Sequence, residues 1–337
     1  MDRARLAISI GCPCGIGPEV SLLAAFKRPF PSLLVGDEFV LRRTASLYPI
    51  DSARLIRVQS PEEAWALQEG THAVFQPTSS LEWNECEPGV PSSAAGAAQL
   101  TWIDTACDLV AQGVADALVT GPVSKYWIAS SQKRGDLFRG HTEYLKQRLG
   151  ALDVVMAFWT ERLVTALVTT HLPLIDVPRA VTSEQVERTI YYLGLFLACL
   201  HEDRTMGRIA VSGLNPHAGE DGLLGHGEEQ RIREGIHAAC IRLEEAQIRG
   251  EVIGPIPSEV AFRLAVQGDY SGVVAMYHDQ ATIPLKLVNF GEAVNVSLGL
   301  PIIRTSVDHG TAYDRAGKGS ADPRGMVLAM HLAEQLV

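Results

Sequence analysis

Three histidines share one sequence context, because each follows an apolar run that is typical of a buried strand. His171 ends the run LeuValThrAlaLeuValThrThrHis, His217 follows IleAlaValSerGlyLeuAsnPro, and His278 follows ValValAlaMetTyr. In open α/β sheets, ligands bind beyond the carboxyl ends of the strands, and neutral imidazole is a good ligand for divalent metals. Any one of these histidines could merely end a turn. Together they predict a site for one divalent cation.

Acidic residues lie next to two of these histidines. Residues 215–222 surround His217 with acids and glycines, and Asp279 directly follows His278. Such carboxylates could orient the imidazole rings that bind a metal. The alternatives are a solvated turn around His217 and a helix N-cap at Asp279.

A second group of residues could bind an anion. The segment GlyHisThrGlu (Gly140–Glu143) opens a helical pattern, with Thr142 as the expected cap, and free N–H groups at a helix start favour an anion. Lys286, Asn295 and Arg304 lie on or beside predicted strands in an otherwise apolar stretch. Because Lys and Arg are seldom buried without partners, they could bind a phosphate or a carboxylate. An internal salt bridge or simple exposure would also explain them.

Two glycine-rich loops stand near the ends of the chain. GlyCysProCysGlyIleGlyProGlu (Gly11–Glu19) follows the first predicted strand and precedes a helix. It matches neither the Rossmann fingerprint nor the phosphate loop of nucleotide hydrolases, so its chemistry indicates only a tight turn. The long polar segment Arg304–Gly319 is either a surface loop or a cofactor loop.

Short β-branched runs alternate with amphipathic helical patterns along nearly the whole chain. The expected strands are Leu6–Ile10, Ser32–Val35, Ala73–Phe75, Ala117–Thr120, Val154–Trp159, Leu163–Val168, Ile209–Ser212, Val273–Met276 and Val294–Ser297. The expected helices are Ala94–Gln112, Ser183–Leu200, Glu228–Arg249 with Gly250 as its C-cap, and Pro323 to the C-terminus. This alternation predicts a largely parallel sheet with helices on both faces.

The length, composition and net charge of the chain limit the classes of protein that the sequence could encode. A length of 337 residues predicts two lobes, and 47% hydrophobic with 20% charged residues is the composition of a globular protein. The net charge of -10, with scattered Lys and Arg, argues against a nucleic-acid partner. Neither a signal peptide nor a membrane-spanning run is evident, so we expect a cytoplasmic protein without a membrane partner. Its six cysteines have no CxxC spacing and should be free thiols.

The motifs, taken in order, resemble the 4-hydroxythreonine-4-phosphate dehydrogenase family of pyridoxal phosphate biosynthesis. They are GlyIleGlyProGlu, GlyHisThrGluTyrLeu, ThrThrHisLeuProLeu, GlyLeuAsnProHisAlaGlyGlu, AlaMetTyrHisAspGln and GlyLeuProIleIleArgThrSerValAspHisGlyThrAla. The resemblance runs from residue 11 to about residue 322. It implies an α/β fold like that of isocitrate and isopropylmalate dehydrogenases, with two α/β/α lobes and a cleft between them. We expect residues 1–135 with 305–337 in the first lobe and residues 136–304 in the second, which would carry the dimer interface.

The resemblance also implies roles for individual residues. One divalent metal ion (Zn, Mg or Co) would be bound by His171, His217 and His278. The substrate-binding residues would be His141, Thr142, Lys286, Asn295 and Arg304. NAD or NADP would bind the loop after Arg304, at Asp308, His309, Gly310 and Thr311. A general base is required as well, and its candidates are His141, Asp279 and Glu259.

The implied reaction is oxidation of the substrate's C3 hydroxyl, with hydride passing to the nicotinamide and the hydroxyl bound by the metal. The resulting 3-keto acid would lose CO2 and give 3-amino-2-oxopropyl phosphate. The implied protein is a homodimer with its active site at the subunit interface.

Some positions depart from the family pattern and keep other substrates and functions open. Cys12 and Cys14 replace an acidic residue and an alanine, Glu259-Val260 replaces an Asp-Thr pair, and Ala281 replaces a glycine. Related enzymes that oxidise 4-phospho-threonate or erythronate-like acids therefore remain an alternative, and a dihydrodiol dehydrogenase is disfavoured by the phosphate-binding residues. Three other classes are a metal-dependent hydrolase, a phosphate acyltransferase and a silent ligand-binding paralogue.

Overall fold

A computed structural model describes residues 3–131, 138–201 and 203–337. The chain divides into two compact units, Met1–Leu152 with Leu300–Val337, and Asp153–Gly299. We call them unit 1 and unit 2 and describe each by itself.

Unit 1 is built on six strands in the order β3-β4-β2-β1-β5-β12, and every pairing among them is parallel. Most of these strands are buried along their length, which matches their continuous apolar sequences. The strands are β1 (Leu6–Ser9), β2 (Leu33–Val35), β3 (Leu55–Arg57), β4 (His72–Phe75), β5 (Ala117–Thr120) and β12 (Ile303–Val307).

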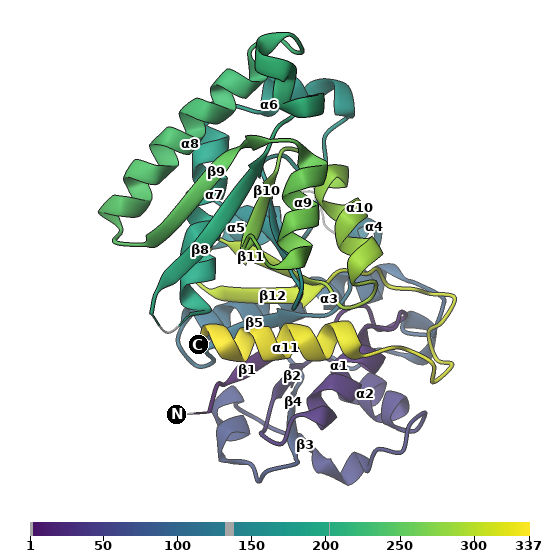
Figure 1. The fold of residues 1–337 in the computed structure, drawn as a ribbon. Helices are drawn as coiled ribbons and strands as arrows, with labels where there is room; N and C mark the ends of the chain where they lie inside the picture. Colours follow the sequence, from purple (N-terminus) through teal and green to yellow (C-terminus); the bar gives the residue numbers. More distant parts are fainter. Residues whose placement is uncertain (1–2, 132–137, 202) are drawn as a thin grey trace. The chain divides into compact units, whose positions relative to one another are not determined.

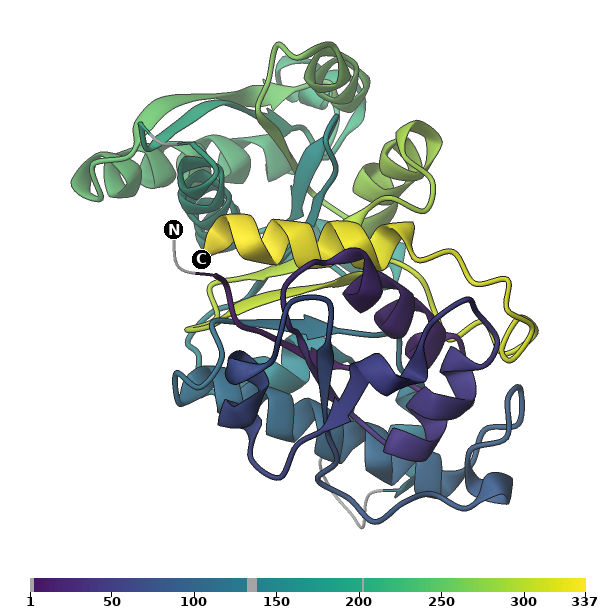
Figure 2. The same ribbon diagram turned by 90° about the horizontal axis from the view of Figure 1, so that it is seen from below.

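Helices cover both faces of this sheet. They are α1 (Gly17–Lys27), α2 (Glu38–Ala45), α3 (Ser93–Ala111), α4 (Lys125–Ser131), α5 (His141–Arg148) and α11 (Arg324–Leu336). The first and last helices, α1 and α11, contact each other, and α11 packs on β12 and β5 (Figures 1 and 2). Helix α3 packs against β1 and β5, and Figure 2 shows it across the strands from α11.

The unit boundaries differ from those expected from the sequence, because α5 and β12 both belong to unit 1. Helix α5 is attached to α3, since the Tyr144 hydroxyl donates to Asp104 (2.6 Å) and Arg148 pairs with Asp108 (2.7 Å). Strand β12 pairs with β5 in parallel register. His141 and Arg304 therefore lie in unit 1, whereas the sequence had suggested the second lobe.

Unit 2 contains six further strands in the order β11-β6-β7-β10-β8-β9. Strand β6 runs antiparallel to β11 and β7, whereas β7, β10, β8 and β9 are parallel neighbours. The strands are β6 (Val155–Trp159), β7 (Val164–Leu167), β8 (Thr205–Ser212), β9 (Arg249–Ile256), β10 (Gly272–Ala275) and β11 (Val294–Leu298). The helices are α6 (Val177–Ala180), α7 (Ser183–Cys199), α8 (Glu228–Glu245), α9 (Ser258–Gln267) and α10 (His278–Val288).

The expected helix Glu228–Arg249 is wrong at its C-terminal end. Helix α8 ends at Glu245, Gln247 takes a left-handed conformation (φ 58°), and strand β9 begins at Arg249. Gly250 is a strand residue rather than a cap. A Cβ there would lie 2.4 Å from the carbonyl oxygen of Gly207, so glycine permits close pairing of β9 with β8.

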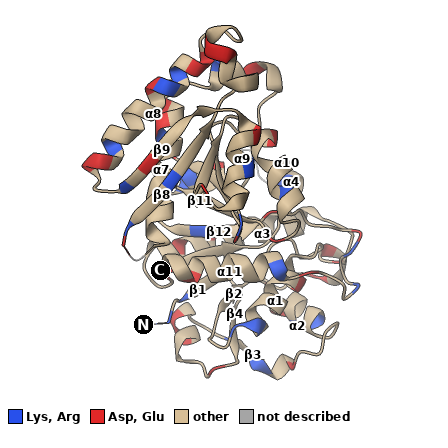
Figure 3. Ribbon diagram, in the orientation of Figure 1, with Lys and Arg blue, Asp and Glu red and all other residues tan. Residues whose placement is uncertain are grey.

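Charges of both signs alternate along α8 and β9 rather than separating into a basic stripe (Figure 3). None of the helices in the described part of the chain has the length and apolar character needed to cross a membrane.

Candidate active site

The three histidines follow three neighbouring strands of unit 2. His171 comes after β7, His278 after β10 and His217 after β8, and β10 pairs in parallel with both of the other two strands. The carboxyl ends of parallel neighbours meet at one edge of the sheet, so the predicted strand-end placement is confirmed. The rings of His171 and His278 lie 5.6 Å apart between centroids.

His278 is held by the residue that follows it. Its Nδ1 lies 2.7 Å from Oδ1 of Asp279, and the His278 side chain is 36% exposed. A carboxylate at Nδ1 fixes the ring and leaves Nε2 for a ligand, which is the usual arrangement of a metal-binding histidine. The alternative of Asp279 as an N-cap is wrong, because Tyr277 occupies that position and α10 starts at His278.

His217 lies on a strained turn. Residues 217–221 all have positive φ, from 46° to 81°, and only one of them is glycine. A left-handed conformation costs roughly 1–2 kcal/mol at each non-glycine residue, so the surrounding structure must enforce it. Within the described residues of the single chain, no three His, Cys, Asp or Glu side chains are placed to bind one metal ion. His171 and His278 are therefore brought together in the chain, and His217 does not complete a triad with them.

Gln280 connects the segments that carry these histidines, and the sequence alone did not single it out. Its Oε1 accepts from the backbone N–H of Met276 (2.6 Å), while its Nε2 donates to the carbonyl of Gly213 (3.0 Å) and to the hydroxyl of Ser258 (2.6 Å). The amide thus ties the ends of β10 and β8 to the start of α9. Its signals in the sequence were its position two residues after a strand-end histidine and its place in the motif AlaMetTyrHisAspGln.

The predicted anion-binding residues of unit 1 lie close together. Arg304, on β12, is 3% exposed and donates through Nη2 to the Thr120 hydroxyl at 2.7 Å. The positive charge of Arg304 also lowers the pKa of His141, the first residue of α5. Thr142 is buried within the first turn of α5, but it is not the cap as expected, because Gly140 occupies the N-cap position.

Burial and neighbouring cations keep the His141 ring neutral. Desolvation is the largest cause that lowers the pKa of His141 well below its ordinary value, and the charges of Arg304 and Lys125 add to it. Burial also lowers the pKa of Arg304 to about 9, with the nearby Glu143 carboxylate opposing the shift. At neutral pH the guanidinium is therefore charged and the imidazole is uncharged, which makes His141 a poor proton acceptor but a competent hydrogen-bond donor.

The remaining predicted substrate and catalytic residues lie in unit 2. Asn295 is on β11 and is half-buried, and Glu259 is exposed in the first turn of α9. Lys286 is exposed on α10, so the expectation that it lies on or beside a strand is wrong.

The predicted cofactor loop of unit 1 packs onto the first glycine-rich loop. The carbonyl of Thr311 accepts from the backbone N–H of Ile16 (2.9 Å), and a Cβ on Gly15 would lie 2.5 Å from that oxygen. Gly310 has open space around its Cα, while Nδ1 of His309 lies 3.0 Å from the Gly310 carbonyl oxygen. Asp308 is half-buried at the start of the loop. The two glycine-rich loops thus form one structure, although nearly 300 residues separate them in the sequence.

Cys12 and Cys14 lie inside this structure. Both are fully buried, and the Cys12 sulfur is 3.6 Å from the Tyr313 hydroxyl. A hydrogen bond from Cys14 is the largest cause that lowers the pKa of Cys12 to about 7, although burial opposes it. The same interaction, with burial, raises the pKa of Cys14. All six cysteines are free, as expected.

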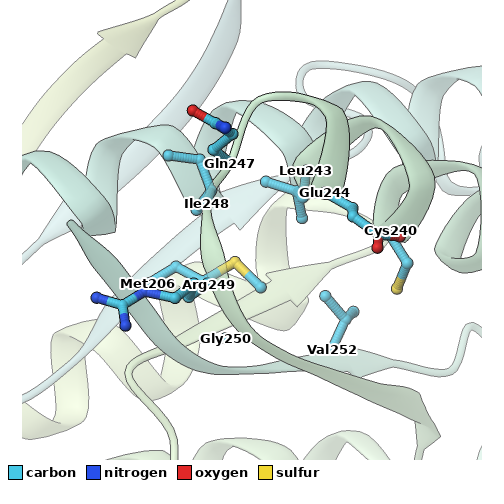
Figure 4. Close-up of a pocket in the computed structure, with 9 residues that line it drawn as sticks. All are labelled: Met206, Cys240, Leu243, Glu244, Gln247, Ile248, Arg249, Gly250 and Val252. Atoms are coloured by element: carbon cyan, nitrogen blue, oxygen red, sulfur yellow. The ribbon is translucent and has the colours of Figure 1, made fainter.

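A cavity of about 480 Å³ lies elsewhere in unit 2, where α8 ends and β9 begins (Figure 4). Apolar side chains of Met206, Leu243, Ile248 and Val252 line it, with Glu244 and Arg249 among its polar residues. None of the predicted site residues is part of its lining.

Parallel strands whose carboxyl ends carry clustered histidines, together with a buried cationic site, define an α/β enzyme. The chain belongs to the family described as "Pyridoxal phosphate biosynthetic protein PdxA", whose model matches residues 29–333. It is 42% identical over 341 residues to the 4-hydroxythreonine-4-phosphate dehydrogenase of Acidithiobacillus ferrooxidans, covering 100% of this chain and 97% of that protein. The enzyme of the same name from Desulfosudis oleivorans is 39% identical, covering 98% and 95%.

Solved structures agree with this assignment. The fold is similar to that of 4-hydroxythreonine-4-phosphate dehydrogenase from Klebsiella pneumoniae, with a TM-score of 0.81 and 34% identity over 98% of this chain and 99% of that chain. A terephthalate 1,2-cis-dihydrodiol dehydrogenase from Burkholderia xenovorans is also similar, with a TM-score of 0.66, 28% identity and 98% coverage of both chains.

Proposed function

We propose that this protein oxidises 4-hydroxythreonine-4-phosphate at C3, using NAD or NADP, and that the 3-keto acid then loses CO2 to give 3-amino-2-oxopropyl phosphate. Family membership and the names of the relatives support the reaction. The structural observation that carries the proposal is that the rings of His171 and His278 lie close together beyond the ends of two adjacent parallel strands.

The metal would be held by His171, His278 and His217. The first two suit this role, since their rings are 5.6 Å apart and Asp279 fixes the His278 ring. A bound divalent cation would stabilise the substrate's alkoxide and the enolate left after loss of CO2. Asp279 acts by orienting His278, so Glu259 is the better candidate for the general base. His141 would donate a hydrogen bond to the substrate rather than accept a proton.

We further propose that the active site is completed by a second copy of the chain. Exposed apolar side chains follow each histidine: Ile175 (84%) after His171, Leu223 (83%) after His217, and Leu287 and Phe290 (81% each) after His278. Exposed large apolar side chains that accompany functional residues would suit an interface with another chain. A homodimer would cover them and could bring the third histidine to the other two.

Substrate and cofactor would bind the remaining predicted residues. The substrate-binding residues would be His141, Thr142, Lys286, Asn295 and Arg304. The nicotinamide cofactor would bind along Asp308–Thr311, where the open space at Gly310 leaves the backbone accessible to a large ligand. The free thiols and the net charge of -10 support a cytoplasmic enzyme that has no nucleic-acid partner.

A direct assay tests the proposal. Purified protein is mixed with 4-hydroxythreonine-4-phosphate and either NAD or NADP, and NADH or NADPH is followed by absorbance. The expected result is turnover that a chelator abolishes and that one of Zn²⁺, Co²⁺ or Mg²⁺ restores. Turnover of 4-phospho-threonate or phospho-erythronate alone would reassign the substrate. No turnover of any of these acids under all metal conditions would refute a dehydrogenase function.

A further inference from the structure

We propose that Lys125 is a further substrate-binding residue, which contacts the phosphate monoester of the substrate beside His141 and Arg304 at the start of α5. The inference rests on the proposed function for the identity of the substrate. The phosphate-binding role of Lys125 can be measured independently of it.

The backbone position of Lys125 is fixed by close packing. It is the first residue of α4, and β5 ends five residues earlier at Thr120. Gln99 of α3 accepts from the backbone N–H of Ser124 at 3.0 Å. A Cβ on Gly96 of α3 would lie 2.1 Å from the Trp127 carbonyl oxygen, so glycine allows α3 and α4 to touch. Lys125 therefore extends from a rigid base.

The Lys125 side chain reaches the N-terminus of α5. Its Nζ lies 3.6 Å, and its Cε 3.4 Å, from the point that a Cβ of Gly140 would occupy. Gly140 is the N-cap residue of α5 and has a φ of 152°, which favours glycine. The ammonium group is thus beside the free N–H groups and the positive end of that helix.

Two cations converge on the same imidazole. The charges of Arg304 and Lys125 both act on His141, and Arg304 is almost completely buried. The carboxylate of Glu143 also lies near Gly140 and Arg304. A helix N-terminus with an arginine and a lysine beside it is a favourable environment for a dianionic phosphate.

One buried polar atom supports the same conclusion. Among the residues that the structure describes, none provides a hydrogen-bond partner for Nε2 of His141, although this atom is buried. A buried nitrogen without a partner costs free energy, and this cost is recovered when a ligand oxygen accepts its hydrogen bond. Lys125 itself is exposed, as a residue that meets an incoming ligand must be.

The test compares Lys125→Met and Lys125→Arg with the wild-type full chain, and uses Lys146→Met as a control from the last turn of α5. Binding of inorganic phosphate is measured by calorimetry, and KM and kcat are measured with phosphorylated substrate. We expect Lys125→Met to weaken phosphate binding and raise KM by at least roughly tenfold, with a smaller change in kcat, since a charge-assisted hydrogen bond contributes about 1.5–3 kcal/mol. Lys125→Arg should keep most of the wild-type phosphate affinity and a KM near the wild-type value. Lys146→Met should resemble the wild type.

Unchanged phosphate affinity and KM in Lys125→Met would overturn the proposal, as would a wild-type protein that does not bind phosphate. An equal loss in Lys125→Met and Lys146→Met would also overturn it, because it would indicate a general surface-charge effect. If the wild type binds phosphate, Lys125→Met does not, and 4-hydroxythreonine-4-phosphate is not turned over, then the proposed substrate is wrong while Lys125 remains a phosphate-binding residue.

Discussion

Both carboxylate oxygens of Glu229 accept hydrogen bonds from Asn215, one from its backbone N–H and one from its side-chain amide, each at 2.9 Å. Glu229 is only 6% exposed and lies in the first turn of α8. Asn215 is the N-cap residue of the left-handed turn that carries His217. A buried acidic side chain therefore anchors the strained segment of the candidate active site.

Replacing Glu229 with Gln should release this turn. The Gln side chain has the same shape as Glu, but it has one acceptor oxygen and one donor NH2 group. Asn215 presents two donors, its backbone N–H and its side-chain amide, so one hydrogen bond is lost and a buried donor is left unpaired. We expect the unfolding free energy to fall by roughly 1–3 kcal/mol, and metal affinity to fall by roughly 10–100-fold, as for other residues that orient metal ligands. Urea unfolding and metal titration measure the two effects. Glu234→Gln, at an exposed position of the same helix, should change neither.

The histidines should be shared between two copies of the chain. Each single His→Ala variant at positions 171, 217 and 278 should lose metal-dependent turnover. Co-expression of two differently tagged variants gives mixed dimers in which one of the two sites can be intact. Statistical mixing then predicts that about a quarter of the sites are active. His171 and His278 are close together in one chain, so each site would take these two histidines from one chain and His217 from the other. We therefore expect activity when His217→Ala is co-expressed with His171→Ala or with His278→Ala. Co-expression of His171→Ala with His278→Ala should give no activity. Failure of all three pairings would argue against a shared site.

The sequence predicted much of this arrangement because the strands before the histidines are short, apolar and β-branched. Strand β9 was missed because the helical periodicity of α8 continues into it. Strand β12 was missed because Arg304, Thr305 and Ser306 interrupt its apolar pattern. The left-handed turn at residues 217–221 has no local signal, since four of its five residues are not glycine. The hydrogen bonds from Asn215 to Glu229, a residue further along the chain than this turn, hold the segment that leads into it.

Stability should depend on pH through His72, a fully buried residue of β4. Burial is the main cause that lowers its pKa to about 4, and the charges of Arg54 and Arg28 contribute. The unfolded chain, with an ordinary histidine pKa near 6.5, binds the proton more readily than the folded protein does. The stabilisation is thus complete above pH 6.5 and is lost as the pH falls towards 4.

The loss should reach about 3 kcal/mol at the acidic end of this window, since one pKa unit corresponds to about 1.4 kcal/mol. Urea unfolding at several pH values between 7 and 4.5 measures the slope. His72→Leu should flatten it, while His331→Leu, at an exposed position of α11, should leave it unchanged. An identical slope in His72→Leu and the wild type would show that other groups control the acid response.

The substitution Cys12→Asp should preserve the fold and change turnover only modestly. Cys12 is fully buried, so a carboxylate needs hydrogen bonds to be tolerated there. The groups that lower the pKa of the Cys12 thiol are the Cys14 thiol, the Tyr313 hydroxyl and the backbone N–H groups of Cys14 and Gly15. All of these can donate to a carboxylate, which is similar in charge to the thiolate that they already favour.

The matched comparison is Cys12→Ser, which has no charge at neutral pH. If negative charge at position 12 supports the loop, Cys12→Asp should retain more activity than Cys12→Ser. The melting temperature of Cys12→Asp should stay within a few degrees of the wild-type value, which corresponds to a change in unfolding free energy of roughly 1 kcal/mol for a chain of this size. Steady-state kinetics and thermal unfolding measure both quantities. A large loss of activity in Cys12→Asp with an unchanged melting temperature would show instead that the sulfur itself has a role in the site.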